Sequence, residues 1–178
     1  MLHLLKHKSY FTVVHFGCSD ILEDRNGLHQ IYPLNFDTPL AVYCDERTNG
    51  GGLTVLMRCS DGSVTLSREW ADYKNVFGTL IKEFWAGNEI MHKVTTNGRT
   101  CLLRVELRSY DGNFIYVEYS NFPLSLTQII TDYISVDAVS NSTAGDSFSR
   151  QNSMMFKTFS RDNDLANYTY TKVYGAPW

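Results

Sequence analysis

Residues 103–119 read LRVELRSYDGNFIYVEY, and this stretch decides the fold class. Apolar and charged residues alternate strictly from Leu103 to Arg108, as a strand buried on one face requires. The segment Tyr110–Asn113 predicts a turn, because its Gly112 and Asn113 tolerate positive φ. Phe114–Tyr119 is then the partner strand, so the stretch predicts a β-hairpin.

Further strands are expected on both sides of this hairpin. Leu40–Tyr43 and Leu53–Arg58 are two of them, the second after the tight turn Gly50-Gly51-Gly52. Ile129–Val139 is also β-prone, whereas 140–178 is rich in Ser, Asn, Asp and Gly and predicts ordered loops. The fold class is therefore α+β, with a mainly antiparallel sheet.

Two short helices are predicted between the strands. Ser67 would cap the first, which carries Trp70, Tyr73 and Phe77 on one face and ends at Gly78. The second would cover Ile81–Ala86 and end at Gly87.

Composition and charge exclude several classes of function before any motif is considered. The chain has 178 residues, of which 43% are hydrophobic, enough for one domain with a real core. A net charge of -3 gives no electrostatic attraction to nucleic acid or to anionic membranes. No apolar run is long enough to span a membrane. Residues 1–17 are expected to be an N-terminal extension without a signal peptide, because Lys6-His7-Lys8 interrupts its apolar segments.

The cysteines stand at positions 18, 44, 59 and 101. No C-x-x-C spacing or histidine pair accompanies them, which argues against a zinc site. Their even number is compatible with two disulfides and an oxidising compartment, and equally with four free thiols.

A series of short motifs runs through the chain in a fixed order. They are Cys18-Ser19-Asp20-Ile21, Val42-Tyr43-Cys44-Asp45, Asn49–Val55, Asp61-Gly62-Ser63-Val64, Trp70-x-x-Tyr73-Lys74-Asn75-x-Phe77-Gly78, Glu83-Phe84-Trp85-x-Gly87-Asn88-Glu89-x-x-His92, Leu103–Leu107, Thr143–Ser147 and Arg161-Asp162-Asn163-Asp164. In order and spacing this series resembles the fibrinogen C-terminal domain family, which includes fibrinogen chains, ficolins, angiopoietins and tenascin ends.

The resemblance implies a small N-terminal subdomain, a central antiparallel sheet with short helices, and a loop-built C-terminal subdomain that binds calcium and ligand. The domain would cover 18–178. It also implies that Cys18 and Cys44 form the family's first disulfide, which closes a loop of about 27 residues and stabilises the fold by roughly 3 kcal/mol. Tyr170 stands where the first cysteine of the family's second disulfide is expected. The domain is therefore expected to be incomplete at its C-terminal end, and to lack a closing strand that would cover a sheet edge.

The same resemblance assigns a calcium site. Asp162 and Asp164 match the carboxylates of the family's calcium loop, and the backbone carbonyls of Ala166 and Tyr168 would complete the shell. An EF-hand is excluded, because Asn167 replaces its required glycine. The alternative is an ordinary solvated acidic loop.

Cys59 and Cys101 have no counterpart in the family. Cys59 follows the strand Leu53–Arg58, and Cys101 precedes the strand that ends at Arg108. If these two strands are antiparallel neighbours, as the resemblance implies, the two side chains would approach disulfide distance. A second disulfide is therefore one hypothesis, and two separate buried thiols are the other.

No catalytic residues are predicted. Gly145-Asp146-Ser147 superficially resembles a lipase-esterase motif, but that family places its motif and its histidine base differently. All five histidines lie upstream of this motif, at 3, 7, 15, 29 and 92. Gly145 and Asp146 are better interpreted as a turn.

By resemblance, the function is extracellular recognition. One hypothesis is lectin-like binding of glycans or acetylated microbial ligands, as in innate immunity. The alternatives are an adhesion or receptor-binding module of the angiopoietin or tenascin type, and a fragment that has lost its ligand pocket. Asn141 and Asn167 lie in glycosylation sequons. No collagen-like or coiled-coil stalk precedes Cys18, so binding is expected to be monovalent.

Overall fold

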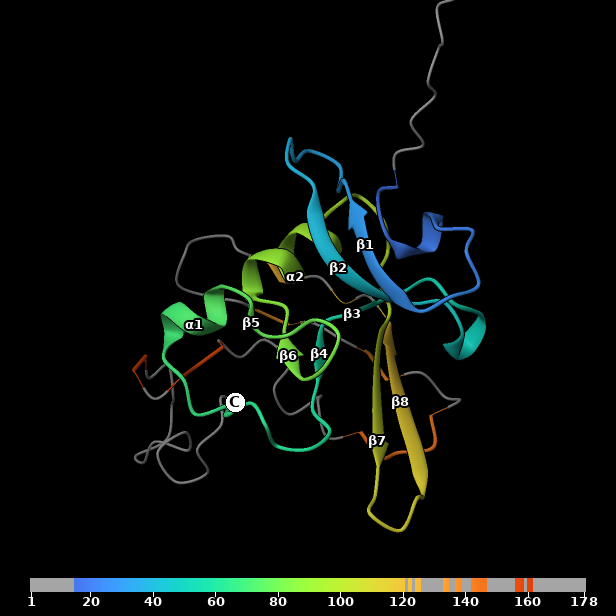
Figure 1. Cartoon of the computed structure of the whole chain (residues 1–178), viewed down its shortest axis with the longest axis vertical. Helices are drawn as coiled ribbons and strands as arrows, with labels where there is room; N and C mark the ends of the chain where they lie inside the picture. Colours follow the sequence, from blue (N-terminus) through green and yellow to red (C-terminus); the bar gives the residue numbers. More distant parts are fainter. Residues whose placement is uncertain are drawn as a thin grey trace, which may run out of the picture.

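The computed structural model describes residues 15–120, 122, 124–125, 133–134, 137–138, 142–146, 156–158 and 160–161. Within these residues it has short helices and antiparallel strands only, which confirms the α+β class (Figure 1). The helical elements are η1 (Cys18–Asp20), η2 (Thr48–Gly50), α1 (Trp70–Lys74) and α2 (Asn88–Thr95). The strands are β1 (Gly27–Ile31), β2 (Leu40–Asp45), β3 (Leu53–Val55), β4 (Met57–Arg58), β5 (Phe77–Gly78), β6 (Phe84–Trp85), β7 (Leu103–Arg108), β8 (Phe114–Ser120), β9 (Leu124–Ser125), β10 (Tyr133–Ile134) and β11 (Asp137–Ala138).

The N-terminal part is a sheet in the order β1-β2-β3. Its inner side is a small core in which Ile31, Val42 and the two cysteines Cys18 and Cys44 are buried. The strand predicted at Leu40–Tyr43 is confirmed and continues to Asp45.

The strand predicted at Leu53–Arg58 divides between two sheets. Its first half, β3, pairs with β2, and its second half, β4, pairs with β6. Leu56 lies between the halves, and its carbonyl accepts a hydrogen bond of 2.8 Å from the N–H of Ala86. This segment therefore connects the N-terminal sheet to the central sheet β4-β6-β5.

The first predicted helix exists but is shorter than expected. It begins after Glu69 rather than Ser67, because the chain before it is held in a different conformation. The Tyr73 hydroxyl donates to the Leu66 carbonyl at 2.6 Å, and the Arg68 side chain donates to the Thr65 carbonyl at 2.9 Å. The helix ends at Lys74, so the predicted end at Gly78 is wrong.

Phe77 and Gly78 form strand β5 instead. Gly78 has φ +81°, and a Cβ at this position would collide with the carbonyl oxygen of Glu83 on the neighbouring chain segment. Glycine is needed here because β5 and β6 approach each other so closely.

The second predicted helix, Ile81–Ala86, is wrong. The N–H groups of Thr79 and Lys82 close a turn, and the chain returns as β6 against β5. Gly87 does not end a helix but precedes one, since it is the N-cap residue of α2. Its φ of +89° and its closeness to the backbone of Asn75 exclude a larger residue.

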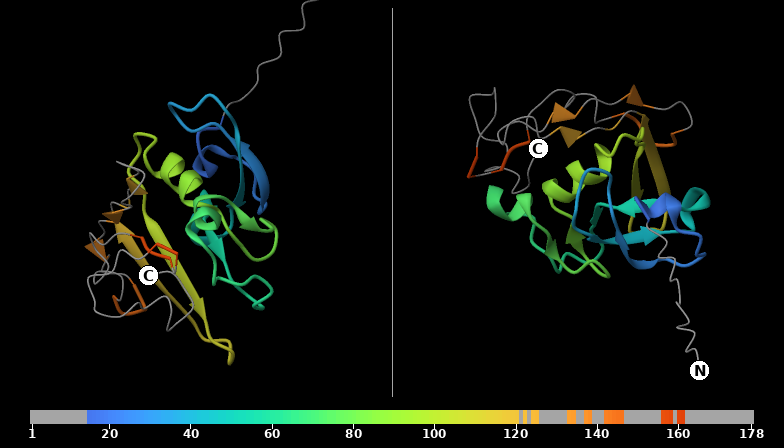
Figure 2. Two further views of the ribbon diagram at one scale, coloured as in Figure 1. Left: turned by 90° about the vertical axis from the view of Figure 1, so that its left-hand side faces the viewer. Right: turned by 90° about the horizontal axis from the view of Figure 1, so that it is seen from above.

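The predicted hairpin is confirmed as β7 and β8, paired from Leu103↔Tyr119 to Arg108↔Phe114. Short strand β11 adds to β8, so the described order is β11-β8-β7. In the left view of Figure 2 this ribbon forms a layer beside the one that contains α2 and the N-terminal sheet. Of the β-prone segment Ile129–Val139, the structure describes β10 and β11.

An aromatic core lies between these layers. The ring of Tyr73 contacts those of Phe77, Trp85 and Phe156 edge-on, at centroid distances of 5.2, 5.3 and 5.3 Å. The indole N–H of Trp85 donates to the carbonyl of Tyr73 at 3.0 Å, so the buried polar atom is satisfied. This core fixes α1 against the central sheet.

Candidate functional site: the entry to the acidic loop and its supports

Residues 156–161 lead directly into Asp162, and the described ones among them pack on α1. Phe156 is buried, with its ring centroid 5.8 Å from that of Trp70. The backbones of Thr158 and Arg161 exchange two hydrogen bonds of 3.0 and 3.1 Å. This short turn holds the chain in a defined position at the start of the acidic loop.

Two further contacts attach the turn to the start of α1. Ser160 Oγ accepts a hydrogen bond of 3.0 Å from the backbone N–H of Trp70, one of the N–H groups that a helix leaves free at its first turn. The guanidinium carbon of Arg161 lies 4.4 Å from the centroid of a Trp70 ring, a cation–π distance. Both contacts link Ser160 and Arg161, the described residues just before the acidic loop, to Trp70, which packs against the aromatic core.

The predicted calcium ligands Asp162, Asp164, Ala166 and Tyr168 lie outside the described residues, as do Asn141 and Asn167 of the two sequons. Within the described residues, one group of three potential metal ligands comes together: Cys18, Cys44 and Glu46. Its two sulfurs are joined to each other in a disulfide, so it is not a metal centre.

A buried carboxylate lies elsewhere in the described chain. Glu83 is 2% exposed and accepts hydrogen bonds from the backbone N–H groups of the loop 60–64. The donors are the N–H groups of Ser60, Asp61 at 2.5 Å, Gly62 at 2.8 Å and Val64 at 2.9 Å, and the hydroxyl of Ser63 at 3.2 Å. These donors, the Ser60 N–H first among them, hold the pKa of the Glu83 carboxyl far below its usual range.

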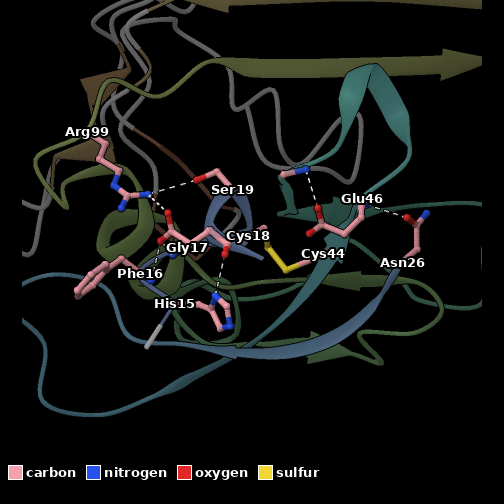
Figure 3. The surroundings of a disulfide bond; sticks show 11 residues. His15, Phe16, Gly17, Cys18, Ser19, Asn26, Cys44, Glu46 and Arg99 are labelled. Carbon is pink, nitrogen blue, oxygen red and sulfur yellow. Dashed lines mark hydrogen bonds and ion pairs between the residues drawn. A yellow bond between two sulfur atoms is a disulfide. The ribbon is translucent and has the colours of Figure 1, made fainter. Parts of the chain in front are cut away.

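The Cys18–Cys44 disulfide lies in the N-terminal part, where it joins η1 to β2 and is fully buried. It is the pairing that the family resemblance implied. Figure 3 shows the polar contacts around it, in which Arg99 donates to the Asp20 carboxylate at 2.8 Å and to the Ser19 hydroxyl at 3.3 Å. The hydrogen bond from Arg99 lowers the pKa of Asp20.

Asp20 also fixes the segment that precedes η1. Its second carboxylate oxygen accepts hydrogen bonds from the backbone N–H groups of Phe16 at 2.8 Å and Gly17 at 3.1 Å. His15 Nδ1 lies 2.9 Å from the carbonyl oxygen of Asp20. The described chain therefore enters the domain in a fixed conformation.

The hypothesis of a second disulfide is not supported, since Cys59 and Cys101 are both free thiols. Its premise fails, because β4 pairs with β6 while β7 pairs with β8. The alternative of two buried thiols is also only partly right: Cys59 is exposed and Cys101 half-buried. Loss of water around the sulfur raises the pKa of Cys59, and the neighbouring Glu83 carboxylate raises it further.

A turn is predicted at Gly145-Asp146, but the bend in the described segment 142–146 lies just before it, at Thr143 and Ala144, and this segment runs beside β8. The hydroxyl of Tyr119 lies 3.2 Å from the Asp146 carboxylate, and the N–H groups of Thr143 and Ala144 donate to the carbonyl of Tyr116. Ser147 lies outside the described residues. Asp146 therefore helps to hold this segment against strand β8.

Sequence reasoning missed Glu83 and the Trp70–Arg161 contact. Glu83 bonds to a loop about twenty residues earlier in the chain, and no local pattern around a glutamate reveals such a distant partner. Two signals were present in the sequence: the turn sequence Asp61-Gly62-Ser63, which predicts a loop, and the position of Glu83 at the start of one of the ordered motifs.

No helix in the described part of the chain has the length and apolar character to cross a membrane.

Comparison with known proteins places these features in a family. The family model "Fibrinogen beta and gamma chains, C-terminal globular domain" matches residues 17–178. Fibrinogen C domain-containing protein 1 of Mus musculus is 34% identical over 167 residues, covering 90% of this chain and 36% of that protein. Ryncolin-4 of Cerberus rynchops is 34% identical over 165 residues, covering 91% and 47%. Fibrinogen-like protein A of Apostichopus parvimensis is 37% identical over 153 residues, covering 83% and 53%.

The chain thus spans between a third and about half the length of these curated relatives. Among solved structures, the fibrinogen-like globe domain of human ANGPTL2 matches with a TM-score of 0.83 and 30% identity, over 92% of this chain and 76% of that one. Lamprey fibrin D-dimer, solved with the peptide Gly-His-Arg-Pro-amide, matches with a TM-score of 0.76 and 28% identity, over 93% and 57%. The disulfide, the sheets and these matches agree: the chain belongs to the fibrinogen C-terminal domain family and has the fold of a fibrinogen-like globe.

Proposed function

We propose that this chain is a non-catalytic, extracellular recognition module that binds glycans or acetylated ligands of microbial surfaces in a lectin-like way. The observation that carries the proposal is the contact of Phe156, Ser160 and Arg161 with Trp70 at the start of α1. A fixed start to the acidic loop would lower the entropy cost of ordering that loop when it binds an ion or a ligand.

We further propose that the acidic loop binds calcium. Asp162 and Asp164 offer carboxylate oxygens, and Ala166 and Tyr168 offer backbone carbonyls, a donor set that suits a hard cation. With two carboxylates, the affinity would be that of extracellular modules, with Kd about 10⁻⁴ to 10⁻³ M. Calcium would supply positive charge and rigidity to the loops that contact the ligand.

The buried Cys18–Cys44 disulfide supports an extracellular location, since structural disulfides persist in oxidising compartments. The two sequons at Asn141 and Asn167 would then be open to glycosylation.

A second candidate function is binding of a protein or peptide receptor. The lamprey fibrin relative was solved with a peptide bound, so a domain of this fold can hold a short peptide. The chain is also similar to the fibrinogen-like globe domains of human ANGPTL2 and ANGPTL6, the latter with a TM-score of 0.84 at 26% identity, and this similarity keeps the angiopoietin-type alternative open. Fold alone does not choose between the two.

The deciding experiment is a glycan array probed with the purified chain in millimolar calcium and again in EDTA. The lectin-like proposal expects binding to acetylated glycans that is lost in EDTA and lost in an Asp162→Asn/Asp164→Asn variant. A matched control is Asp24→Asn, which removes one exposed carboxylate elsewhere.

A pull-down with cell-surface receptors under the same conditions tests the second function. Absence of glycan binding combined with saturable receptor binding would replace the first proposal with the second. Glycan binding that ignores both EDTA and the double variant would remove the calcium loop from the mechanism.

A further inference from the structure

The loop between η1 and β1 is an exposed stretch of the N-terminal part. Residues 22–26 are all exposed, and Leu22 is 99% exposed. In Figure 1 this blue segment curves around the outside of the molecule before it enters β1. Exposed loops are the preferred sites of cleavage by proteases, because a protease must surround the bond that it cuts.

Both ends of this loop are fixed, whereas its middle is not. Ile21 is buried, and its N–H donates to the Cys18 carbonyl at 2.9 Å. At the other end, Asn26 Oδ1 accepts a hydrogen bond of 2.8 Å from the N–H of Glu46. Between these ends, residues 22–25 make no backbone–backbone hydrogen bond within the part of the chain that the structure describes. A protease can therefore bind this backbone in an extended conformation without first breaking a helix or a sheet.

A second exposed loop shows why exposure alone is not enough. Residues 59–63 are exposed as well, but several of their N–H groups donate to the buried Glu83 carboxylate. Extending that loop into a protease would break these hydrogen bonds and leave a buried carboxylate without partners, which is unfavourable. The loop 22–26 differs because its central backbone has no such bonds to lose.

Arg25 lies in the unbonded segment, and no ion pair, hydrogen bond or ring contact holds its side chain within the described residues. Every other described Arg or Lys lies in a helix or strand or makes a contact through its backbone or side chain. Those with such contacts are Arg47, Arg68, Lys82, Arg99, Lys157 and Arg161, and those in helices or strands are Arg58, Lys74, Lys93, Arg104 and Arg108. Trypsin-like proteases bind a basic side chain in an acidic pocket, and Arg25 offers one without losing a contact.

The Cys18–Cys44 disulfide spans this loop, since Arg25 lies between the two cysteines in the sequence. Hydrolysis of the peptide bond between Arg25 and Asn26 adds one water. The hydroxyl goes to the carbonyl carbon of Arg25 and the hydrogen to the nitrogen of Asn26, with no change in oxidation state. The disulfide then joins the two products covalently.

Two further contacts hold the piece that ends at Arg25. The guanidinium of Arg99 bonds to the Asp20 carboxylate at 2.8 Å, and the N–H of Tyr32 donates to the His15 carbonyl at 2.7 Å. Neither contact depends on the peptide bond that is cut. The chain is therefore expected to keep its fold after cleavage.

The new end at Asn26 also has partners. Besides its bond to the Glu46 N–H, the Asn26 side chain hydrogen-bonds to the Asp45 carboxylate. Gly27 pairs with Cys44 in the β1–β2 ladder, which places Asn26 beside Asp45. The positive α-ammonium group created by cleavage would therefore form near a carboxylate of opposite charge.

We propose that the Arg25–Asn26 bond is a processing site for an arginine-specific endoprotease, which converts the chain into a two-chain form held together by the Cys18–Cys44 disulfide. Cleavage separates the backbone of η1 from that of β1 while the domain stays folded. The site lies outside the acidic loop, so the proposal does not depend on which ligand that loop binds.

The test is limited digestion of the folded full chain with trypsin, followed by mass spectrometry with and without dithiothreitol. Among the Arg and Lys bonds of residues 15–120, Arg25–Asn26 is expected to be cut first. Without reductant the two products of this cut should stay together, heavier by one water than the uncut chain. With reductant they should separate into a piece that ends at Arg25 and a piece that begins at Asn26.

The reduced and alkylated chain supplies the reference rate at each bond, because the acidic neighbours Glu23 and Asp24 affect trypsin in the folded and the unfolded state alike. The ratio of the folded to the unfolded rate should be at least about tenfold higher at Arg25 than at Arg47, since cleavage at a bonded segment requires local opening. Arg47 is an exposed arginine whose N–H donates to the Asp45 carboxylate.

Arg25→Gln should abolish this cut and leave Tm unchanged, because the side chain of Arg25 has no recorded contact in the described structure. Arg47→Gln, the same change at another exposed arginine, is the matched control and should leave the cut at Arg25 intact. Arg25→Lys should keep the cut by trypsin, which accepts either basic side chain.

Cleavage at Arg47, Arg68 or Lys82 before Arg25 in the folded chain would overturn the proposal. Equal ratios of folded to unfolded rate at Arg25 and Arg47 would do so too, because the structure would then give Arg25 no advantage. Separation of the two products without reductant would show that the disulfide does not hold a two-chain form together.

Discussion

Arg161 lies over the indole of Trp70, with its guanidinium carbon 4.4 Å from the ring centroid. The residue after Arg161 is Asp162, the first carboxylate of the proposed calcium loop. Trp70, which packs against the aromatic core, thus contacts Arg161, the residue immediately before the loop. Changes in the loop should therefore alter the packing of the core.

Replacing Arg161 with Ala should weaken both the fold and calcium binding. The substitution removes a cation–π contact of about 1 kcal/mol, which lowers Tm by roughly 2–4 °C for a domain of this size. Calcium affinity should fall because the loop entry is no longer fixed, and calorimetric titration measures this. Arg161→Lys keeps the charge over the ring and should lie between wild type and Ala. If the Arg161→Ala variant has the Tm and the calcium affinity of wild type, the cation–π contact neither stabilises the fold nor positions the calcium loop.

Removal of the loop carboxylates is expected to abolish the calcium response without unfolding the domain. In wild type, millimolar calcium should raise Tm, because calcium bound only by the folded chain stabilises it by mass action. Asp162→Asn/Asp164→Asn should show no such rise, whereas Asp24→Asn should respond like wild type. If the double variant still gains stability from calcium, the ion binds at another place.

Glu83→Gln should destabilise the chain at neutral pH, by about 5 °C in Tm, because an amide presents N–H groups to a loop that itself offers N–H donors. The depressed pKa of Glu83 gives the sign of the pH dependence. A carboxyl whose folded pKa is below its ordinary value of 4.5 contributes stability that is fully present above about pH 4.5. That contribution is lost as pH falls toward the folded value.

Thermal melts of wild type and Glu83→Gln between pH 7 and pH 3 check this. The difference in Tm should be constant from pH 7 down to about pH 5 and should shrink below that. A difference that grows on acidification would contradict the role of the ionised carboxylate.

The contrast between residues 103–119 and residues 67–87 shows what the sequence could predict. The hairpin was predictable because alternation and a turn sequence both act locally, and both partners lie in one stretch. Phe77 and Phe84 were assigned to helices from their spacing, but both pair in the central sheet, where Trp85 bridges Met57 and Phe77. Short strands of this kind are decided by tertiary partners, so a local pattern cannot identify them.

The residues around the candidate site also divide into those that the sequence could predict and those that depend on tertiary neighbours. The Cys18–Cys44 pairing followed from family resemblance, because cysteine positions within ordered motifs are specific. The hypothesis of a Cys59–Cys101 bond required knowing which strands are neighbours, and that depends on the division of Leu53–Arg58 between two sheets. Glu83 could not be predicted, because its partners are backbone groups that carry no side-chain signature.

Removing the disulfide should be the most damaging of these changes. Cys18→Ala/Cys44→Ala releases a loop with a sequence separation of 26 residues. The unfolded chain then gains freedom that corresponds to about 3 kcal/mol, or a fall of roughly 6–12 °C in Tm. Cys59→Ser/Cys101→Ser removes the same number of cysteines but no cross-link, and should melt close to wild type. Mass mapping without reductant should find Cys18 joined to Cys44 and the other two thiols open to alkylation. If both double variants lose equal stability, the effect comes from the loss of buried sulfur rather than from the cross-link, and the disulfide would not be what holds η1 against β2.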